Sequence, residues 1–339
     1  MLSFESTDDM APLRLTLACW NYDRTRALAD GRIRPDGIDL NYVSLPVEET
    51  FFRMTRHREF DVAELSLSSY VLSLCRPDAP FVAIPVFPSR AFRHSCIYLH
   101  APSGIKDPKG LAGKRVGAPE FQLTACVWIR GILGDDFGVA ADGVTHVIGG
   151  QEEPGRIEKL GLDLPASIRV ERIGPDQTLA AMLDRGEIDA LFTPRMPSTF
   201  RRDGGRVRRL FEDHRQVERD YFRRTGIFPI MHVIAIRRDV YERDRWVAQS
   251  LQKAFTAAQR ETYADLSETA ALKTMLPWLT AEVEETRRDM GDDFWPYGLD
   301  RNRRTLETFI RYSHEQGLAT RRLSPDDLFA PEALESFKI

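Results

Sequence analysis

Lysine is scarce in this chain relative to arginine. Of the 47 basic residues among 339, 7 are lysine, which leaves 40 arginines against 51 acidic residues and a formal net charge of −4. A protein that binds nucleic acid through its phosphates needs an excess of positive charge, so we expect no nucleic-acid partner. Arginine forks bind carboxylates bidentately. A GC-rich genome produces the same excess, so only arginines placed at a site are informative.

Few cysteines and no long apolar runs argue against export and membrane insertion. The four cysteines, at positions 19, 75, 96 and 126, show no C-x-x-C spacing, and a disulfide framework is not expected in a chain of this size. The first ten residues hold three acidic residues and no basic one, unlike a signal peptide. No apolar run approaches the ~18 residues of a membrane helix. We therefore expect a cytoplasmic protein with no membrane contact.

Short β-like runs alternate with helical stretches along most of the chain, which is the pattern of sheets covered by helices. The β-like runs are 13–19, 38–43, 61–65, 81–86, 93–99, 114–118, 144–148, 168–171, 188–193 and 231–236. The expected helices are 23–30, 47–58, 68–75, 122–133, 176–185, 246–263 and 301–316. The sequence therefore predicts an α/β protein with a helical C-terminal segment.

The order of these elements predicts two lobes. Two α/β units are joined by crossover strands at 93–99 and 231–236, and helices close the end of the chain. We expect a two-lobed clamshell with mixed sheets flanked by helices. Residues 12–100 with 231–339 form the first lobe, and 101–230 form the second. In such a fold the cleft between lobes binds the ligand, and closure about the crossovers is the expected motion.

Several short segments resemble those of one known family. They are 18–26 (ACWNYDRTR), 87–95 (FPSRAFRHS), 113–121 (GKRVGAPEF), 149–156 (GGQEEPGR), 186–191 (GEIDAL) with Pro194-Arg195, 226–232 (GIFPIMH) and 295–298 (WPYG). Together they resemble the 4,5-dihydroxyphthalate decarboxylase family, within the type II periplasmic-binding-protein fold, over roughly residues 13 to 329. The resemblance implies that a dihydroxylated aromatic diacid loses CO₂, as in phthalate degradation.

Decarboxylation of an electron-rich aromatic acid needs a proton donor for the ring carbon, and histidine is suited by its ordinary pKa of ~6.5. Of the seven histidines, His94 and His232 lie on the two expected crossover strands. Because crossover strands line the cleft floor, we expect both histidines to face one ligand. Glu64 lies where this fold has a cleft loop, so we expect it to orient a histidine or to accept a phenolic proton.

Three arginines are the candidate carboxylate ligands. Arg93 and His94 point to opposite faces of an extended segment, so we favour Arg90 beside His94 and leave Arg93 as a secondary or inter-lobe contact. Arg195 follows the run 188–193, where open α/β sheets bind ligands. We expect a further arginine cluster to form a solvated face: Arg201, Arg202, Arg206, Arg208 and Arg209.

Other candidate ligands are aromatic or hydroxyl-bearing. Trp20 and Tyr22 follow an expected strand and are placed to stack on an aromatic ring, with core packing as the alternative. The segment 119–124 precedes a helix, whose free N–H groups bind anions, and the Thr124 hydroxyl adds a donor. Ordinary helix capping is the alternative there. Ser66 is a further donor to a substrate carboxylate.

We expect neither a metal nor another cofactor. There is no H-E-x-x-H motif and no clustered Cys/His spacing. A divalent ion held by His94, His232 and Glu64 stays open. So does a non-catalytic solute-binding protein for an aromatic or other carboxylate, which would use the same arginines, and an isomerase or hydrolase that uses the same histidines. The helical C-terminal third leaves a homo-oligomer open.

Overall fold

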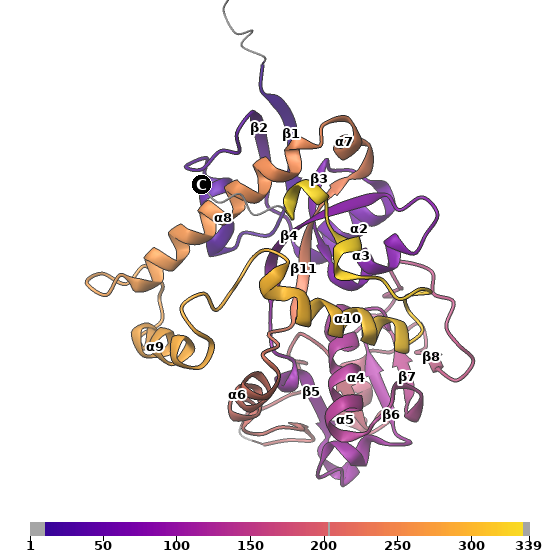
Figure 1. Ribbon diagram of the computed structural model, residues 1–339. Coiled ribbons are helices and arrows are strands. Elements are labelled where there is room, and N and C mark those ends of the chain that lie inside the picture. The colour runs from indigo at the N-terminus through magenta and orange to yellow at the C-terminus, as the bar shows by residue number, and fades with distance from the viewer. Residues whose placement is uncertain (1–10, 203, 335–339) are drawn as a thin grey trace, which may run out of the picture.

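The computed structural model describes residues 11–202 and 204–334, which form two β-sheets in two lobes (Figure 1). The first sheet has the order β2-β1-β3-β11-β4, with β1 (Leu13–Ala18), β2 (Ile38–Val43), β3 (Val62–Ser66), β4 (Phe81–Arg90) and β11 (Ile230–Arg237). The second has the order β10-β5-β9-β6-β7-β8, with β5 (Ile97–His100), β6 (Arg115–Ala118), β7 (Thr145–Ile148), β8 (Arg169–Arg172), β9 (Ala190–Phe192) and β10 (Val207–Arg209). The predicted two-lobed α/β class is confirmed.

Helices cover both sheets. Those that follow strands of the first lobe are α1 (Arg26–Ala29), α2 (Val47–His57) and α3 (Leu67–Leu74). The second-lobe helices are α4 (Thr124–Phe137), α5 (Leu179–Arg185) and α6 (His214–Thr225). The C-terminal helices are α7 (Arg238–Arg243), α8 (Trp246–Ser267), α9 (Leu279–Met290) and α10 (Arg303–Glu315). Of these, α6, α7 and α9 were not expected from the sequence.

Strand direction places the loops that hold ligands at one edge of each sheet. In the first sheet β1 runs parallel to β2 and β3, so the chain leaves all three strands at the same edge. In the second sheet β6 runs parallel to β7 and β9. Loops at the carboxyl ends of parallel strands are the usual ligand site of such sheets. The segments that follow β1, β3, β6, β7 and β9 are therefore the candidate ligand-binding loops.

Both crossovers join the lobes, but the first is not the extended segment that we predicted. Residues His94–Cys96 form a 3-10 helix, η2, and β5 begins at Ile97. The expectation of a strand over 93–99 is therefore wrong at its start, and the alternation of side chains that we applied to Arg93 and His94 does not hold there. The second crossover enters β11 at Ile230, close to the predicted 231.

The boundaries of the lobes stay a prediction. Strand β5, which we assigned to the first lobe, pairs with β9 and β10 in the second sheet. Residues 335–339 of the predicted first lobe, and the acidic residues 1–10 that we used against an export signal, lie outside the described residues.

Part of the arginine cluster at 201–209 is structural rather than solvated. Arg208 and Arg209 belong to β10, and Arg209 stacks over the rings of Tyr98 and Phe200, at 5.6 and 4.9 Å from their centroids. Arg201, Arg202 and Arg206 are exposed, as expected. The sequence pattern concealed the strand because it has three residues and two of them are charged.

The C-terminal helices pack against the outside of both lobes. Helix α8 buries Leu251 and Phe255 against the first sheet. Helix α10 crosses to the second lobe and packs on α4 (Figure 1), where Trp128 contacts the rings of Phe309 and Tyr312 at 5.4 and 5.7 Å. The chain end thus contacts both lobes.

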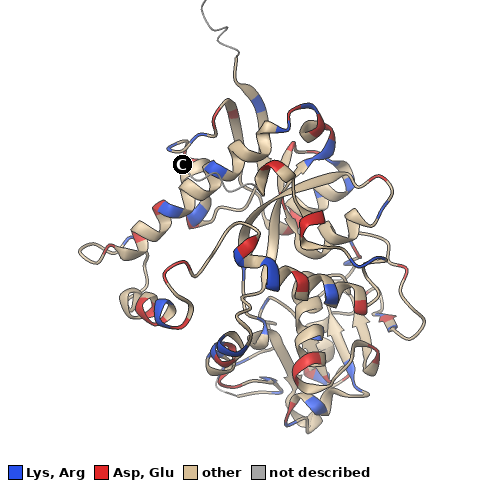
Figure 2. Ribbon diagram, in the orientation of Figure 1, with Lys and Arg blue, Asp and Glu red and all other residues tan. Residues whose placement is uncertain are grey.

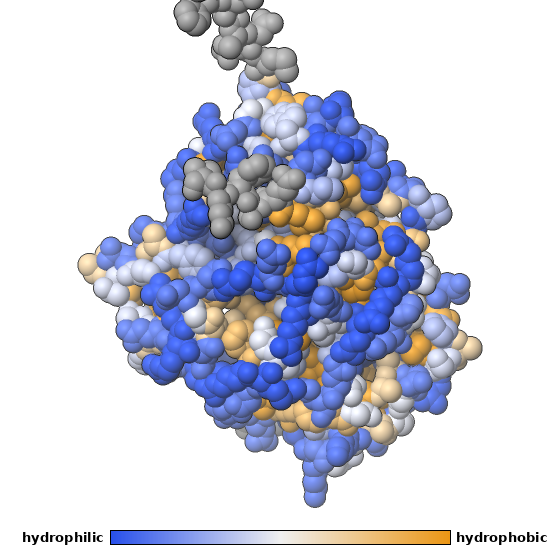
Figure 3. Space-filling view, in the orientation of Figure 1, coloured by the Kyte–Doolittle hydropathy of each residue, from blue (hydrophilic) through white to orange (hydrophobic). Residues whose placement is uncertain are grey.

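The surface carries charges of both signs. Figure 2 shows acidic and basic residues interspersed over both lobes, in keeping with the small net charge. Hydrophilic residues cover most of the face that carries α8, α9 and α10, and hydrophobic residues are visible mainly beside α10 (Figure 3). Among the helices of residues 11–202 and 204–334, none has the length and apolar character needed to cross a membrane.

The packing of α10 on α4 can be tested at a glycine. A methyl group on Gly131 of α4 would overlap the ring of Tyr312, whereas one on Gly134 of the same helix would meet its nearest neighbour, the Val139 carbonyl oxygen, at 3.8 Å. We expect Gly131→Ala to lower the free energy of unfolding by about 2 kcal/mol through overpacking. Gly134→Ala should instead stabilise by up to about 1 kcal/mol through helix propensity.

Urea denaturation of both variants measures these changes. Equal effects at the two glycines would show that α10 does not press on α4 as described.

Candidate functional site

A buried carboxylate, Glu64, lies near the carboxyl end of β3. Its side chain is fully buried. In the described part of the chain four groups donate to it: the Trp20 backbone N–H at 3.0 Å, the Tyr22 hydroxyl at 2.6 Å, His232 Nδ1 at 2.6 Å and, more weakly, the Cys19 thiol at 3.6 Å. An unpaired buried carboxylate would be strongly unfavourable. These four donors therefore decide whether the Glu64 carboxyl group is ionised.

The donors keep Glu64 ionised. Burial acts to raise the pKa of the Glu64 carboxyl, but attraction to His232 and the hydrogen bonds from His232, Tyr22 and Trp20 hold that pKa below its ordinary value. Burial, with the Glu64 charge, raises the pKa of both the Tyr22 hydroxyl and the Cys19 thiol, so both keep their protons. Glu64 is therefore an acceptor surrounded by donors.

His232 is oriented by Glu64. Residue 232 lies opposite Ser66 in the pairing of β11 with β3, close to Glu64 on the same strand. Because Glu64 is ionised, the imidazole donates through Nδ1, and the ring packs edge-on against Phe51 at 4.8 Å. About 16% of the side chain is exposed. This geometry fixes the tautomer and leaves Nε2 to act on a ligand.

Ser66 and Thr124 link the two lobes beside this pair. The Ser66 and Thr124 hydroxyls lie 2.8 Å apart, and Thr124 Oγ1 also accepts from the Ser68 backbone N–H at 3.0 Å. Both residues are buried. The Ser68 hydroxyl is buried and has no partner within the described residues. The start of α4 therefore contacts the start of α3, on the strand that carries Glu64 and opposite His232.

The aromatic candidates lie at the same edge. Trp20 is 42% exposed, whereas Tyr22 is committed to Glu64 through its hydroxyl. Arg24 lies between the rings of Tyr22 and Trp295, at 4.1 and 4.3 Å from their centroids. Trp20 is thus free to meet a ligand, and Tyr22 supports the buried carboxylate.

Arg90 is not available as predicted. Its guanidinium is buried and donates to the carbonyls of Phe228 and Pro296, at 3.2 and 2.7 Å, and to the Asn302 side chain. Burial lowers its pKa to about 9. We expected Arg90 to bind the substrate because the sequence does not reveal that residues 295–302, more than 200 positions further along the chain, fold onto the end of β4. The role that the structure supports for Arg90 is to hold this segment.

Arg93, and not Arg90, has a guanidinium that no backbone carbonyl or carboxylate of the described residues binds. It is half-buried, and within the described residues its guanidinium donates to sulfur atoms, Met231 Sδ at 3.1 Å and Cys96 Sγ at 3.6 Å. Sulfur is a weak acceptor. Within the described residues this guanidinium has no ion pair with a carboxylate, and its hydrogen bonds go to the two sulfur atoms.

His94 is separated from the Glu64–His232 pair. It is 2% exposed and packs against the rings of Phe211 and Tyr221, at 5.7 and 5.0 Å. It shares none of its ring contacts with His232, so the structure does not bring the two histidines to one ligand. The physical reason is the 3-10 turn, which directs His94 toward α6, a helix that the sequence analysis did not expect.

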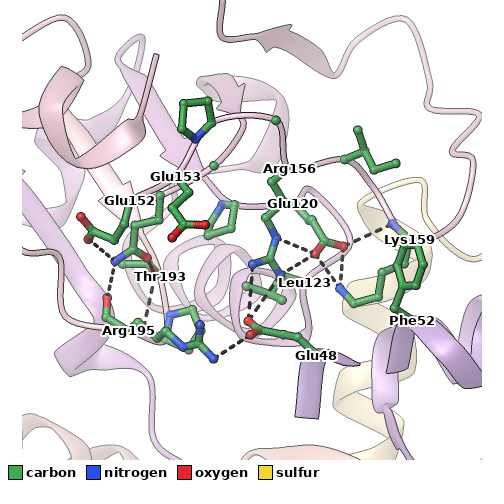
Figure 4. Close-up of a pocket in the computed structure, with 17 residues that line it drawn as sticks. Glu48, Phe52, Glu120, Leu123, Glu152, Glu153, Arg156, Lys159, Thr193 and Arg195 are labelled. Carbon is green, nitrogen blue, oxygen red and sulfur yellow. Dashed lines mark hydrogen bonds and ion pairs between the residues drawn. The ribbon is translucent and has the colours of Figure 1, made fainter. Parts of the chain in front are cut away.

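A cavity of about 580 Å³ is lined by residues of both lobes (Figure 4), and neither Glu64 nor His232 is part of its wall. Its wall includes Leu123 and Phe52, whose chain neighbours Thr124 and Phe51 contact Ser66 and His232. The rest of the wall comes from the segments after β6, β7 and β9 and from the first turn of α2. The carboxyl edges of the two sheets therefore face each other across this cavity.

Arg195 lines the cavity and is paired with a carboxylate, and its role as a substrate ligand stays a prediction. Its guanidinium meets Glu48 of α2 at 2.6 Å, and 62% of the side chain is exposed. Sequence reasoning missed the other charged residues of the wall, chiefly Glu48, Glu120, Arg156 and Lys159. The signal was present in the segment 149–156, one of those that carry the resemblance to the family. A side chain at Gly150 would overlap the Glu153 carbonyl, so this glycine lets the loop fold tightly at the cavity.

No metal site is visible in residues 11–202 and 204–334, where no three His, Cys, Asp or Glu side chains are grouped to hold an ion. His94, Glu64 and His232, the set considered from the sequence, are divided between two places. This arrangement does not test whether the protein needs a cofactor, and the expectation that it needs none stays a prediction.

The fold defines the class of protein. No family model matches the chain. The periplasmic sulfonate-binding protein SsuA of Methylobacillus flagellatus KT is 14% identical, with a TM-score of 0.53 and coverage of 95% of this chain and 93% of that one. SsuA of Escherichia coli is 14% identical, with a TM-score of 0.51 and coverage of 95% and 99%. At such identity the likeness shows the fold alone: this is a protein of the periplasmic-binding-protein fold.

Sequence similarity defines the family. A 4,5-dihydroxyphthalate decarboxylase of Comamonas testosteroni is 43% identical over 330 residues, covering 97% of this chain and all of that protein. Another of the same name, from Pseudomonas putida, is 46% identical over 214 residues, covering 63% of this chain and 83% of that protein. The chain belongs to the 4,5-dihydroxyphthalate decarboxylase family, which confirms the resemblance noted from the sequence.

The placement of His94 predicts a pH dependence of stability. Burial, with nearby Arg224, lowers the pKa of His94 from 6.5 to about 4. The unfolded chain regains the ordinary pKa and binds the proton first as pH falls, so stability is lost between about pH 6.5 and pH 4. The contribution of this one residue is about 3 kcal/mol.

We expect His94→Gln to reduce the slope of unfolding free energy against pH in that window, measured by urea titrations. His57→Gln, which alters an exposed histidine, serves as the control. A slope unchanged by His94→Gln would contradict the buried, neutral state assigned to His94.

Proposed function

We propose that this chain is a carboxy-lyase that releases CO₂ from 4,5-dihydroxyphthalate without an oxidant. Membership of the decarboxylase family supports the reaction. The observation that carries the mechanism is the 2.6 Å hydrogen bond between His232 Nδ1 and the buried Glu64, beside a cavity between the lobes. A histidine held in one tautomer is the group that ring protonation needs.

The reaction balances with one proton. Each carboxylate of 4,5-dihydroxyphthalate has a hydroxyl para to it. That hydroxyl gives its proton to water as electron density passes into the ring, and the carbon that bears the carboxylate takes a proton. The bond to the carboxylate then breaks, CO₂ leaves, and the electron pair of that bond restores an aromatic phenolate, which regains a proton from water. The products are CO₂ and 3,4-dihydroxybenzoate, and this route requires no cofactor.

In this proposal His232 Nε2 delivers the proton to the ring carbon. Glu64 stays ionised, stabilises the imidazolium through Nδ1–H and prevents the ring from turning. Glu64 is thus a positioning residue, and Tyr22 and the Trp20 N–H support it in turn. His94, which we had placed with His232, takes no part.

Substrate binding in the proposal uses the remaining predicted residues. Arg93 binds an anionic oxygen of the substrate, since its present partners are sulfur atoms. Trp20 stacks on the ring. Ser66 and Thr124 bond to each other, so their part is to place the unpartnered Ser68 hydroxyl, and the start of α3, beside the ligand.

A non-catalytic solute-binding function is not favoured. The solved binding proteins share the fold at 14% identity, whereas the curated relatives at 43% and 46% identity are named decarboxylases. Cytoplasmic residence, as expected from the sequence, is part of the proposal. Self-association stays a prediction.

We expect His232→Gln to lower kcat for CO₂ release about 100- to 10 000-fold, because it removes the proton donor. Glu64→Gln should lower kcat with little change in KM, since it affects the donor and not substrate contacts. The measurement is CO₂ release with the loss of substrate absorbance, with and without chelator.

His94→Gln is the matched control and should retain wild-type kcat, because its ring contacts lie elsewhere. Near-wild-type turnover by His232→Gln would disprove the assignment. Binding of 4,5-dihydroxyphthalate without CO₂ release by the wild-type protein would favour a solute-binding function.

A further inference from the structure

Glu48 joins the lobes across the cavity. It lies in the first turn of α2, in the first lobe, and its two carboxylate oxygens meet different arginines of the second lobe (Figure 4). Oε2 receives the Arg195 guanidinium at 2.6 Å, and Oε1 receives that of Arg156 at 3.4 and 3.5 Å. One carboxylate thus occupies the space between two guanidinium groups.

The two arginines do not depend on Glu48 equally. Arg156 is anchored by Glu120, with Nε and one terminal nitrogen at 3.0 and 2.7 Å from the same oxygen. Glu120 is 2% exposed and is also held by Lys159, whose Nζ lies 2.6 Å from each of its oxygens. Arg156 therefore keeps its position when Glu48 leaves, and its longer contact with Glu48 is the weaker one.

Moving the Glu48 side chain away from the two arginines costs little free energy. Its side chain is 34% exposed and that of Arg195 is 62% exposed, and exposed ion pairs are worth at most about 1 kcal/mol. Without Glu48, Arg195 loses its ion-pair partner within the described residues, and Arg156 keeps Glu120, which Lys159 also neutralises. The wall also holds the carboxylates of Glu152 and Glu153, so the site for an anion is local to the two guanidinium groups, whose geometry selects a carboxylate.

We infer, on the basis of the proposed function, that Glu48 occupies the place of a substrate carboxylate. The carboxylate that the substrate keeps displaces Glu48 and binds between Arg156 and Arg195, while the neighbouring carboxylate on the ring lies toward His232. These two arginines therefore select a vicinal aromatic diacid over a monoacid. Glu48 competes with the substrate carboxylate for these two arginines, and it lies between them when the cavity is empty.

The position of the cavity fits this inference. Phe52 lines it while Phe51 contacts His232, so the arginines and the proton donor flank the same stretch of α2. Its volume of about 580 Å³ lies in the range of small-molecule sites. Glu152, also in the wall, is bound by Ser198 and Gln151 and does not compete for the arginines.

The test measures binding of phthalate, which has the two vicinal carboxylates but no hydroxyl and so is not decarboxylated by the proposed route. The comparison ligand is 2-carbamoylbenzoate, in which one carboxylate is a neutral amide. Isothermal titration calorimetry on the full chain gives Kd for wild type, Glu48→Gln, Arg195→Gln and the double variant. Glu49→Gln is the control, since Glu49 lies on the same turn and pairs with Arg53 at 2.8 Å.

We expect Glu48→Gln to tighten phthalate binding about fivefold, the equivalent of about 1 kcal/mol, because the competitor is removed. Arg195→Gln should weaken phthalate binding and reduce its preference over the amide. In the Arg195→Gln background the gain from Glu48→Gln should fall below about twofold, since the remaining contact with Arg156 is the longer one. Glu49→Gln should leave both ligands unaffected.

Unchanged or weaker phthalate binding by folded Glu48→Gln would overturn the inference, and so would an equal gain for both ligands. These outcomes are separable from the proposed function. Continued CO₂ release from 4,5-dihydroxyphthalate without the binding pattern would overturn the role of Glu48 alone. The binding pattern without any CO₂ release would overturn the decarboxylation and leave the diacid site in place.

Discussion

The buried charge of Glu64 is the constraint on which the rest of the site depends. A carboxylate taken fully out of water is tolerated only when donors surround it. Here the donors come from the segment after β1 and from β11, which enters the sheet from the second crossover. Satisfying one charge therefore fixes the loop at residues 19–22, the register of β11 and the tautomer of His232. The result is a histidine, the proton donor of the proposed function, whose orientation is set before any ligand arrives.

The second organising feature is the meeting of two sheet edges. Segments that follow parallel strands of the second lobe, β6, β7 and β9, line the cavity together with α2, which follows the parallel strand β2 of the first lobe. The first lobe supplies Glu64, His232 and one partly exposed carboxylate, Glu48. The second supplies the cations. Such a division ties ligand capture to the approach of the lobes, because neither lobe alone holds a complete site.

Much of this could be predicted from the sequence, and the failures have physical causes. The buried strands and most of their connecting helices were readable from apolar periodicity. His232 was proposed because it lies on a crossover, Glu64 because of its place in the fold, and Arg195 because it follows a strand; the structure places Glu64 and His232 within β3 and β11. Arg90 and His94 were misplaced because their surroundings come from residues 295–302 and from α6, far along the chain. Glu48 was missed because a carboxylate in the first turn of a helix is ordinary in sequence, and its partners appear only when the lobes are assembled.

The central claim is that His232 supplies the proton that replaces CO₂ on the ring, and chemical rescue tests it most directly. The His232→Gly variant would be assayed for CO₂ release from 4,5-dihydroxyphthalate with a series of substituted imidazoles, after phthalate binding had shown that the site is intact. The account predicts an inactive variant whose turnover is restored by imidazole and varies with the pKa of the added base. Wild-type turnover by folded His232→Gly, with no imidazole present, would contradict it.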